Sequence, residues 1–361
     1  MLTIVVIWLH ILCHFNALLS SLDVFKIKFL TESDSLIEGI FFGLIVIISL
    51  LSIILYDKTY IWSYLLMASC VISQCLVFVL WKKSGLISII NILGLLVSIV
   101  GVGKRLFITA CSKELREMVS NIQDDSHETI SEATIAHLPA PVQKWLIKSG
   151  AIGKKRIMRM DSVQEYKLKM KEEQTEWFNA IANQTSFSNP PGFFWTLDMK
   201  MKGLPVFGRD MFNKGKGFMT IKLLNLLNVV NVGGVEKINE AALQRFLGEA
   251  VWVPTVALCN YIKWEHVDDH TSKAIMTIDG VSGEGFFDFD DEGKPTRFRA
   301  LRYQGVEENA ERKWWHAEVL EHKNLGGYLV PSKCQATWKL DKGDWTWASF
   351  EIITARYSHY E

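Results

Sequence analysis

Five polar residues in the second half of the chain could carry chemistry if the fold brings them together: Gln184, Asp210, Lys222, Arg245 and Glu249. Two carboxylates beside a cation can exchange protons with a substrate or hold a phosphate headgroup. Arg245 and Glu249 are four residues apart, so they share one side of a helix, away from its apolar face. The competing interpretation is a solvated ion pair, which contributes roughly 0.2–0.5 kcal/mol.

Aromatic residues could complete such a site. Ten of the thirteen tryptophans lie after residue 110. Indoles at this density either line a groove for an acyl chain or form the core of a sheet. We name Trp195 and Trp252, together with the five polar residues, as candidate ligand-binding residues, and we assign a catalytic role to none of them.

Two histidine patterns are considered as metal or haem sites. The segment 265–270 carries histidines and carboxylates, but it separates two strand-like segments and is expected to be a hairpin loop. His10 and His14 could ligate a haem or a metal or relay protons, yet no second ligand pair occurs in the other apolar segments. We therefore expect hydrogen bonding between helices here, with no metal site and no cofactor.

Several signatures are absent from the sequence, namely G-x-S-x-G, G-x-G-x-x-G, G-x-x-x-x-G-K, H-E-x-x-H and paired C-x-x-C. The chain has 39 basic and 39 acidic residues, so it has no bulk field that would attract nucleic acid. The sequence therefore excludes nucleic acid as a partner and leaves enzymatic activity undecided, with the balance against it.

The elements that must position these residues change character near residue 110. Four nearly uncharged apolar segments, 2–22, 36–56, 60–81 and 85–103, are each long enough to cross a bilayer as a helix. They predict a four-helix transmembrane anchor over 1–110. A cleaved signal peptide is the alternative for the first segment, but it lacks basic residues before the apolar run. Basic residues divide five against four between the two sides, which leaves the side of the following domain undetermined.

The remainder is predicted as a juxtamembrane linker over 111–131, least structured at 124–126, and an α+β domain over 132–361. Helices are expected over 129–138 and from the Pro-Ala-Pro sequence at 139–141, the second with Val142, Trp145 and Leu146 on one side, and hairpin turns are expected at 215–217 and 291–293. Apolar and polar residues alternate in segments such as 195–202 and 312–320, which indicates about nine antiparallel strands. A helix over 239–251 has an apolar face and ends before Pro254. We expect a curved, half-barrel-like antiparallel sheet with this helix across it. Cys259 and Cys334 are predicted either to form one disulfide or to remain free thiols.

Five motifs then suggest a family. They are HLPAPVQKWL at 137–146, NPPGFFW at 189–195, GLPVFGRD at 203–210, MTIKLL at 219–224 and LGEAVWVP at 247–254. In this order, over roughly 135–357, they resemble a bacterial family of uncharacterised membrane-anchored proteins. The resemblance implies a multi-pass protein of the bacterial plasma membrane and no established activity. The expected architecture is also similar to half-barrel carriers of lipids and lipoproteins, a likeness of fold alone.

Three functions follow from this sequence. The first is a membrane-tethered domain that binds an apolar or amphipathic ligand, with the bilayer as its other partner. The second is an enzyme centred on Asp210 and Glu249. The third is a structural or signalling partner of another membrane protein. Ligand identity, protein partners and oligomeric state are not determined by the sequence.

Overall fold

The structure is a computed structural model that describes residues 2–22, 24, 35–79, 85–123 and 128–360. The chain forms two compact units, Met1–Ala110 and Cys111–Glu361. Each unit has its own core, so each is described by itself.

The first unit contains four apolar helices: α1 Leu2–Ser21, α2 Leu36–Leu55, α3 Ile61–Val79 and α4 Gly85–Ser120. In the described part of the chain these four are long and apolar enough to cross a membrane. They agree with the four predicted spans and mark an integral, multi-pass membrane protein. Helix α4 continues beyond residue 103, where the apolar segment ends, to Ser120. The predicted unstructured stretch Asp124–Asp125–Ser126 lies outside the described residues.

Polar side chains link three of the apolar helices. Nε2 of His14 on α1 lies 2.9 Å from Oγ of Ser73 on α3, and Nδ2 of Asn91 on α4 donates to the same oxygen at 2.9 Å. Asn91 also donates to Gln74 at 3.0 Å. The predicted hydrogen bonding between helices is therefore confirmed for His14. His10 is fully buried beside it, with the two ring centroids 4.4 Å apart.

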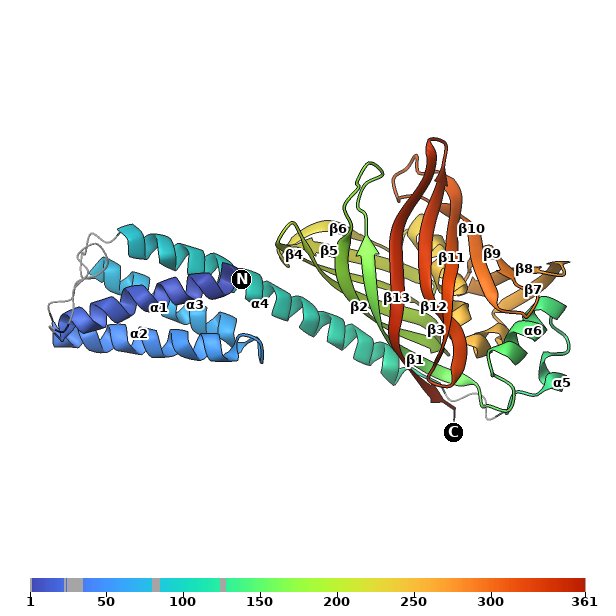
Figure 1. Ribbon diagram of the computed structural model, residues 1–361, viewed down its shortest axis with the longest axis horizontal. Helices are drawn as coiled ribbons and strands as arrows, with labels where there is room; N and C mark the ends of the chain where they lie inside the picture. The colour runs from blue at the N-terminus through green and yellow to red at the C-terminus, as the bar shows by residue number, and fades with distance from the viewer. Residues whose placement is uncertain (1, 23, 25–34, 80–84, 124–127, 361) are drawn as a thin grey trace. The chain divides into compact units, whose positions relative to one another are not determined.

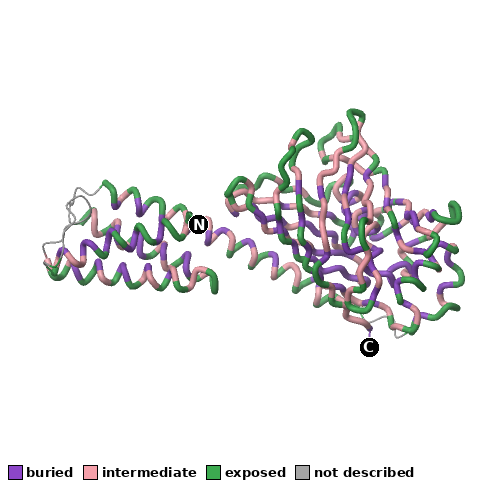
Figure 2. Tube along the Cα trace, in the orientation of Figure 1, coloured by how far each residue is buried: buried purple, intermediate pink, exposed green. Residues whose placement is uncertain are grey.

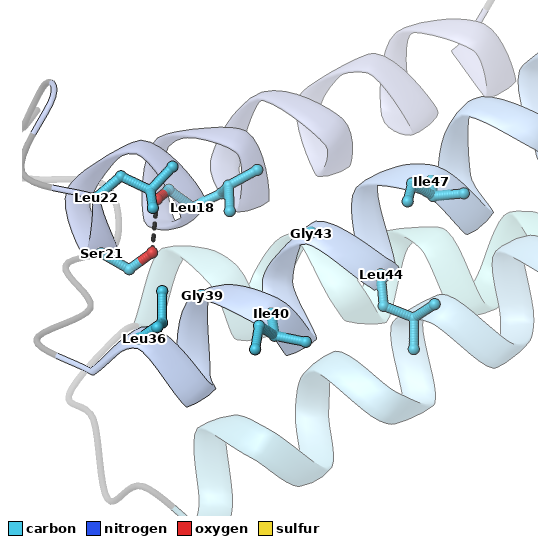
Figure 3. Close-up of a pocket in the computed structure, with 9 residues that line it drawn as sticks. All are labelled: Leu18, Ser21, Leu22, Leu36, Gly39, Ile40, Gly43, Leu44 and Ile47. Carbon is cyan, nitrogen blue, oxygen red and sulfur yellow. Dashed lines mark hydrogen bonds between the residues drawn. The ribbon is translucent and has the colours of Figure 1, made fainter.

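Gly39 and Gly43 lie where α2 meets α1. A Cβ atom at Gly39 would lie 2.0 Å from Oγ and 2.7 Å from Cβ of Ser21, so a larger residue would force this side chain to shift. Next to this contact is an open apolar pocket of about 350 Å³ (Figure 3). Its lining residues are Leu18, Ser21, Leu22, Leu36, Gly39, Ile40, Gly43, Leu44 and Ile47.

The second unit is built on one antiparallel sheet, in which the described residues form thirteen strands. Two consecutive meanders, β6 to β1 and β13 to β7, join where β1 pairs with β13, so that green β1 lies beside red β13 (Figure 1). The predicted curved sheet with a helix is confirmed. The bounds are β1 Ile157–Leu168, β2 Phe178–Ser188, β3 Pro191–Met201, β4 Leu204–Asn213, β5 Lys216–Leu223, β6 Leu227–Gly233, β7 Ile262–Asp268, β8 Thr271–Ile278, β9 Val281–Phe289, β10 Pro295–Tyr303, β11 Arg312–Leu325, β12 Tyr328–Leu340 and β13 Gly343–His359.

The predicted number of nine strands was wrong, because β2, β4, β5 and β6 lack a clear apolar alternation. On β2 the buried alternate positions are Ala180, Ala182, Gln184 and Ser186, which are small or polar. Only their burial in the folded sheet reveals the period of two. The predicted hairpin turns at Gly215 and at 291–293 join β4 to β5 and β9 to β10.

Helix α7, Glu236–Gly248, lies on the concave face of the sheet and packs against β4, β5 and β8–β10. It begins earlier than the predicted 239–251 and gives way to two 3-10 turns, η1 Glu249–Trp252 and η2 Pro254–Leu258. Pro254 is the first residue of η2. Proline has no backbone N–H group, so a regular α-helix cannot continue through this position without losing a hydrogen bond. Purple, buried residues gather in the lower part of this unit, and its upper hairpin loops are green and exposed (Figure 2).

Two short helices precede the sheet. α5, Glu132–Ile135, is a single turn where 129–138 was expected to be helical, because Thr129 instead forms a bridge with Lys155. α6, Ala140–Lys148, begins at the predicted Pro-Ala-Pro sequence and buries Val142, Trp145 and Leu146 as expected. Cys259 and Cys334 are free thiols, so the disulfide alternative does not hold.

Candidate functional site

Three strands present candidate residues on the same face of the sheet. Gln184 on β2 is the register partner of Trp195 on β3, and Trp195 is the partner of Asp210 on β4. Register partners in an antiparallel sheet point to the same side. Asp210 and Gln184 are 4% and 2% exposed, so this is the side that faces α7 and the core.

Arg245, from the last turn of α7, reaches into this row and makes three hydrogen bonds. Its Nη1 donates to Oδ2 of Asp210 at 2.6 Å, its Nε to Oε1 of Glu249 at 2.7 Å, and its Nη2 to Oε1 of Gln184 at 3.3 Å. Nε2 of Gln184 donates to the second oxygen of Glu249 at 2.7 Å. Four of the five predicted polar residues therefore converge, and we call Gln184, Asp210, Arg245 and Glu249 the Arg245 cluster.

The interpretation of Arg245 and Glu249 as a solvated pair was wrong. Their side chains are 17% and 10% exposed, since the polar row of β2–β4 covers the face of α7 that helical geometry directs away from its apolar residues. Breaking a buried pair by removing one partner costs far more than breaking an exposed one, about 3–5 kcal/mol. The cluster is therefore part of what holds α7 on the sheet.

Burial also sets the protonation of the cluster. It raises the pKa of Asp210 and of Glu249, and the charge of Arg245 opposes this shift. Burial alone would lower the pKa of Arg245, but the carboxylates of Glu249 and Asp210 outweigh it and raise that pKa. The guanidinium therefore stays charged and holds the two carboxyl groups.

Aromatic rings surround the cluster. The guanidinium carbon of Arg245 lies 4.6 Å from the ring centroid of Phe193 and 5.0 Å from that of Trp195. Trp195 in turn meets the ring of Tyr166 edge-on at 5.7 Å. The predicted residue Trp252 lies apart from this group: its Nε1 donates to the Pro331 carbonyl at 3.1 Å, which makes it part of the core.

Lys222 does not join the cluster. It lies on β5 opposite Phe207 of β4, whereas Asp210 lies opposite Met219. Lys222 was selected because it occurs in a family-like motif, and a motif does not determine which side of a strand a residue occupies.

Several further polar residues at this site were not predicted from the sequence. Nε2 of Gln164 on β1 lies 3.4 Å from Oε1 of Gln184, and Gln184 also donates to Oγ of Ser186 at 3.1 Å. A second arginine, Arg302 on β10, also faces α7 and donates to the Ala241 carbonyl at 2.8 Å. The available signal was positional, since Gln164 lies two residues before the buried Tyr166 and Arg302 lies two residues after the buried Ala300.

No group of three or more His, Cys, Asp or Glu side chains that could hold a metal ion occurs in the described ranges. His266 and His270 are exposed where β7 turns into β8, as expected for a hairpin.

Fold and site together define a class: a half-barrel domain with a buried ion cluster under its helix, on a chain with four candidate membrane spans. The chain belongs to DUF6544, a family of unknown function whose model matches residues 128–350. This confirms the expected membership of an uncharacterised family. No curated protein matches the chain.

This chain is similar to two solved structures. A LolA superfamily protein from Nitrosomonas europaea is 8% identical, with a TM-score of 0.34, and the match covers 61% of this chain and 94% of that chain. A DUF1329 family protein from Desulfovibrio piger is 10% identical, with a TM-score of 0.31, 64% of this chain and 94% of that chain being covered. At these values neither protein indicates what this chain binds.

Proposed function

We propose that this protein is a membrane-tethered binding module whose half-barrel holds an apolar or amphipathic ligand, such as a lipid or a lipoprotein-like tail, on its concave face. The four candidate spans support the tether, because they keep the domain close to a bilayer that contains such molecules. The concave face supports the ligand class.

The observation that carries the proposal is the limited cover of that face. Helix α7 packs mainly against β4, β5 and β8–β10, which lie toward the two edges of the sheet, so the strands between them are less covered by this helix. Trp195, Trp338 and Phe350 pack against the core yet remain half-buried. Half-buried aromatic side chains on a concave surface are typical of sites for apolar ligands.

The Arg245 cluster supports this function indirectly. Its ion pair with Asp210 and its hydrogen bond to Gln184 join α7 to β4 and β2, which keeps the helix from sliding over the concave face. A rigid helix and sheet provide the preformed walls that a binding site needs. The cluster is thus proposed to be a positioning element for the ligand site.

An enzyme centred on Asp210 and Glu249 is the alternative. Its support is that both carboxyl groups lie within hydrogen-bond reach of Arg245 and have raised pKa values. Each carboxylate, however, is held by this guanidinium, and Glu249 also accepts from Gln184. A satisfied network of this kind favours a structural role, so the binding module is the better supported function.

Native mass spectrometry of the full-length protein, released from detergent micelles, tests the binding module. We expect a bound lipid or fatty acid that survives the activation that strips lipid from the membrane helices. Ala317 on β11 is half-buried and is the register partner of Phe298 and Ala336, both buried in the core. Ala317→Phe should therefore reduce the bound fraction several-fold by filling the face.

Glu318→Phe provides the matched control, since the next residue of the strand points to the opposite side of the sheet. It should retain the ligand at the wild-type level. Wild-type protein that carries no ligand, and that takes up none from added fatty acid, would refute the proposed function.

A further inference from the structure

Arg302 differs from Arg245 in having no acidic partner. It lies on β10 two residues beyond Ala300, which is 1% exposed, and its Nη2 donates to the Ala241 carbonyl of α7. Among the described residues it forms no ion pair, and its Nε is buried without a hydrogen-bond acceptor. A buried guanidinium is normally paired with a carboxylate, because an unpaired charge in a protein interior costs several kcal/mol.

The two carboxylates whose charges act on Arg302 are already paired with another arginine. Asp210 and Glu249 favour its charged form, but both are bonded to Arg245. Burial, together with the charge of Arg245, lowers the pKa of Arg302 to about 10, which still leaves it charged at neutral pH. Arg302 is therefore a half-buried cation on the inner face of the sheet, without an ion-pair partner among the described residues.

The surroundings of Arg302 are aromatic and rich in hydrogen-bond donors. Its guanidinium carbon lies 4.5 Å from the ring centroid of Trp315 and 6.0 Å from that of Trp338. Trp315, Trp338 and Trp345 are successive register partners on β11, β12 and β13, so their rings form a row on one face. Nε1 of Trp315 and Nε1 of Trp345 are buried without partners in the described part of the chain.

An oxyanion would complement this arrangement. A carboxylate or phosphate accepts two parallel hydrogen bonds from a guanidinium, and indole N–H groups are donors only. The flat indole faces suit the first carbons of an attached acyl chain. A neutral headgroup would leave the charge of Arg302 uncompensated.

We propose that Arg302, with the tryptophan row Trp315, Trp338 and Trp345, binds the anionic headgroup of an amphipathic ligand, either a carboxylate or a phosphate. This inference rests on the proposed function, because it assumes that an acyl chain occupies the concave face. It adds a substrate class: fatty acids and anionic lipids are preferred over neutral ones.

The test uses two ligands with identical tails, 9,10-dibromostearic acid and its uncharged methyl ester, whose bromine atoms quench nearby tryptophans. The full-length protein used in this test has the substitutions Trp8→Phe, Trp62→Phe and Trp81→Phe. Only the ten tryptophans after residue 110 then report ligand binding. We expect the acid to bind about tenfold or more tightly than the ester, as for a charged hydrogen-bonded pair. Arg302→Gln should remove this preference and leave ester binding unchanged.

Two variants control for folding and charge. Arg302→Lys keeps the positive charge and should retain part of the preference. Arg299→Gln removes an arginine from the same strand, but one whose Nε donates to Oδ2 of Asp288 at 3.2 Å. It should behave as the wild type, and ester binding in every variant verifies that the binding face is intact.

The outcomes separate the two proposals. Equal binding of acid and ester by the wild type, or an acid preference that survives in Arg302→Gln, overturns the headgroup site and leaves the binding module standing. Quenching by neither ligand refutes the binding module itself. Inorganic phosphate is added alone in a further arm: if it displaces the acid, the site takes a free anion, and the headgroup proposal fails.

Discussion

At the residue scale, Arg245 supplies the positive charge that stabilises two buried carboxyl groups. Arg245→Met should lower the free energy of unfolding by about 3–5 kcal/mol, since Asp210 and Glu249 would keep their burial and lose their counter-charge. Thermal or denaturant unfolding of the full-length protein, followed by circular dichroism, measures the change. Lys200→Met removes an exposed cation outside the cluster and should shift stability by less than about 0.5 kcal/mol.

A triple variant separates charge from packing. Replacing Arg245, Asp210 and Glu249 together by Met, Leu and Leu should recover part of the stability lost in Arg245→Met, because no unpaired charge remains. Wild-type stability in Arg245→Met alone would contradict the assigned role of the cluster.

The sequence predicted this cluster only in part, for a physical reason. The spacing of Arg245 and Glu249 correctly placed them on one side of a helix, and helical geometry correctly turned them away from its apolar face. Their environment could not be predicted, because the surface that buries them comes from β2 and β4, two strands that carry no apolar alternation. The Arg245–Glu249 pair is internal because strands distant from it in the sequence cover it, and local sequence patterns do not show such contacts.

At the element scale, two glycines determine how closely α7 approaches the sheet. A Cβ atom at Gly217 on β5 would lie 2.6 Å from the Ile238 carbonyl oxygen and 2.7 Å from Cβ of Ala242. At Gly283 on β9 it would lie 2.8 Å from side-chain carbons of Leu243 and Gln244. The helix therefore rests on backbone at both contacts.

Gly217→Ala should push α7 outward and destabilise its docking by about 1–3 kcal/mol. Backbone amide hydrogen exchange should then become faster in α7, Glu236–Gly248, and the increase should be larger there than in the strands of the sheet. In Gly208→Ala, on β4, the new methyl group would meet Cβ of Leu197 at 3.6 Å, an ordinary contact, and exchange should stay as in the wild type. Unchanged exchange in Gly217→Ala would show that α7 is held by other contacts.

At the scale of the whole molecule, the four candidate spans dominate solubility. Between them they expose many large apolar side chains, which only a bilayer or detergent can cover. We therefore expect the full-length chain to stay with membranes during a carbonate wash and to appear in the supernatant only after detergent is added. Recovery of the full-length chain in the supernatant after the carbonate wash alone would contradict the membrane anchor.

The seam between β1 and β13 has a further consequence for how this domain is made. β13 follows every other strand in chain order, yet it is the strand that joins the two meanders into one sheet. A nascent chain that stops before Gly343 holds two separate sheets with β1 and β12 as bare edges, the kind of edge on which strands of other chains add. The two meanders can therefore join into one sheet only after β13 has been synthesised.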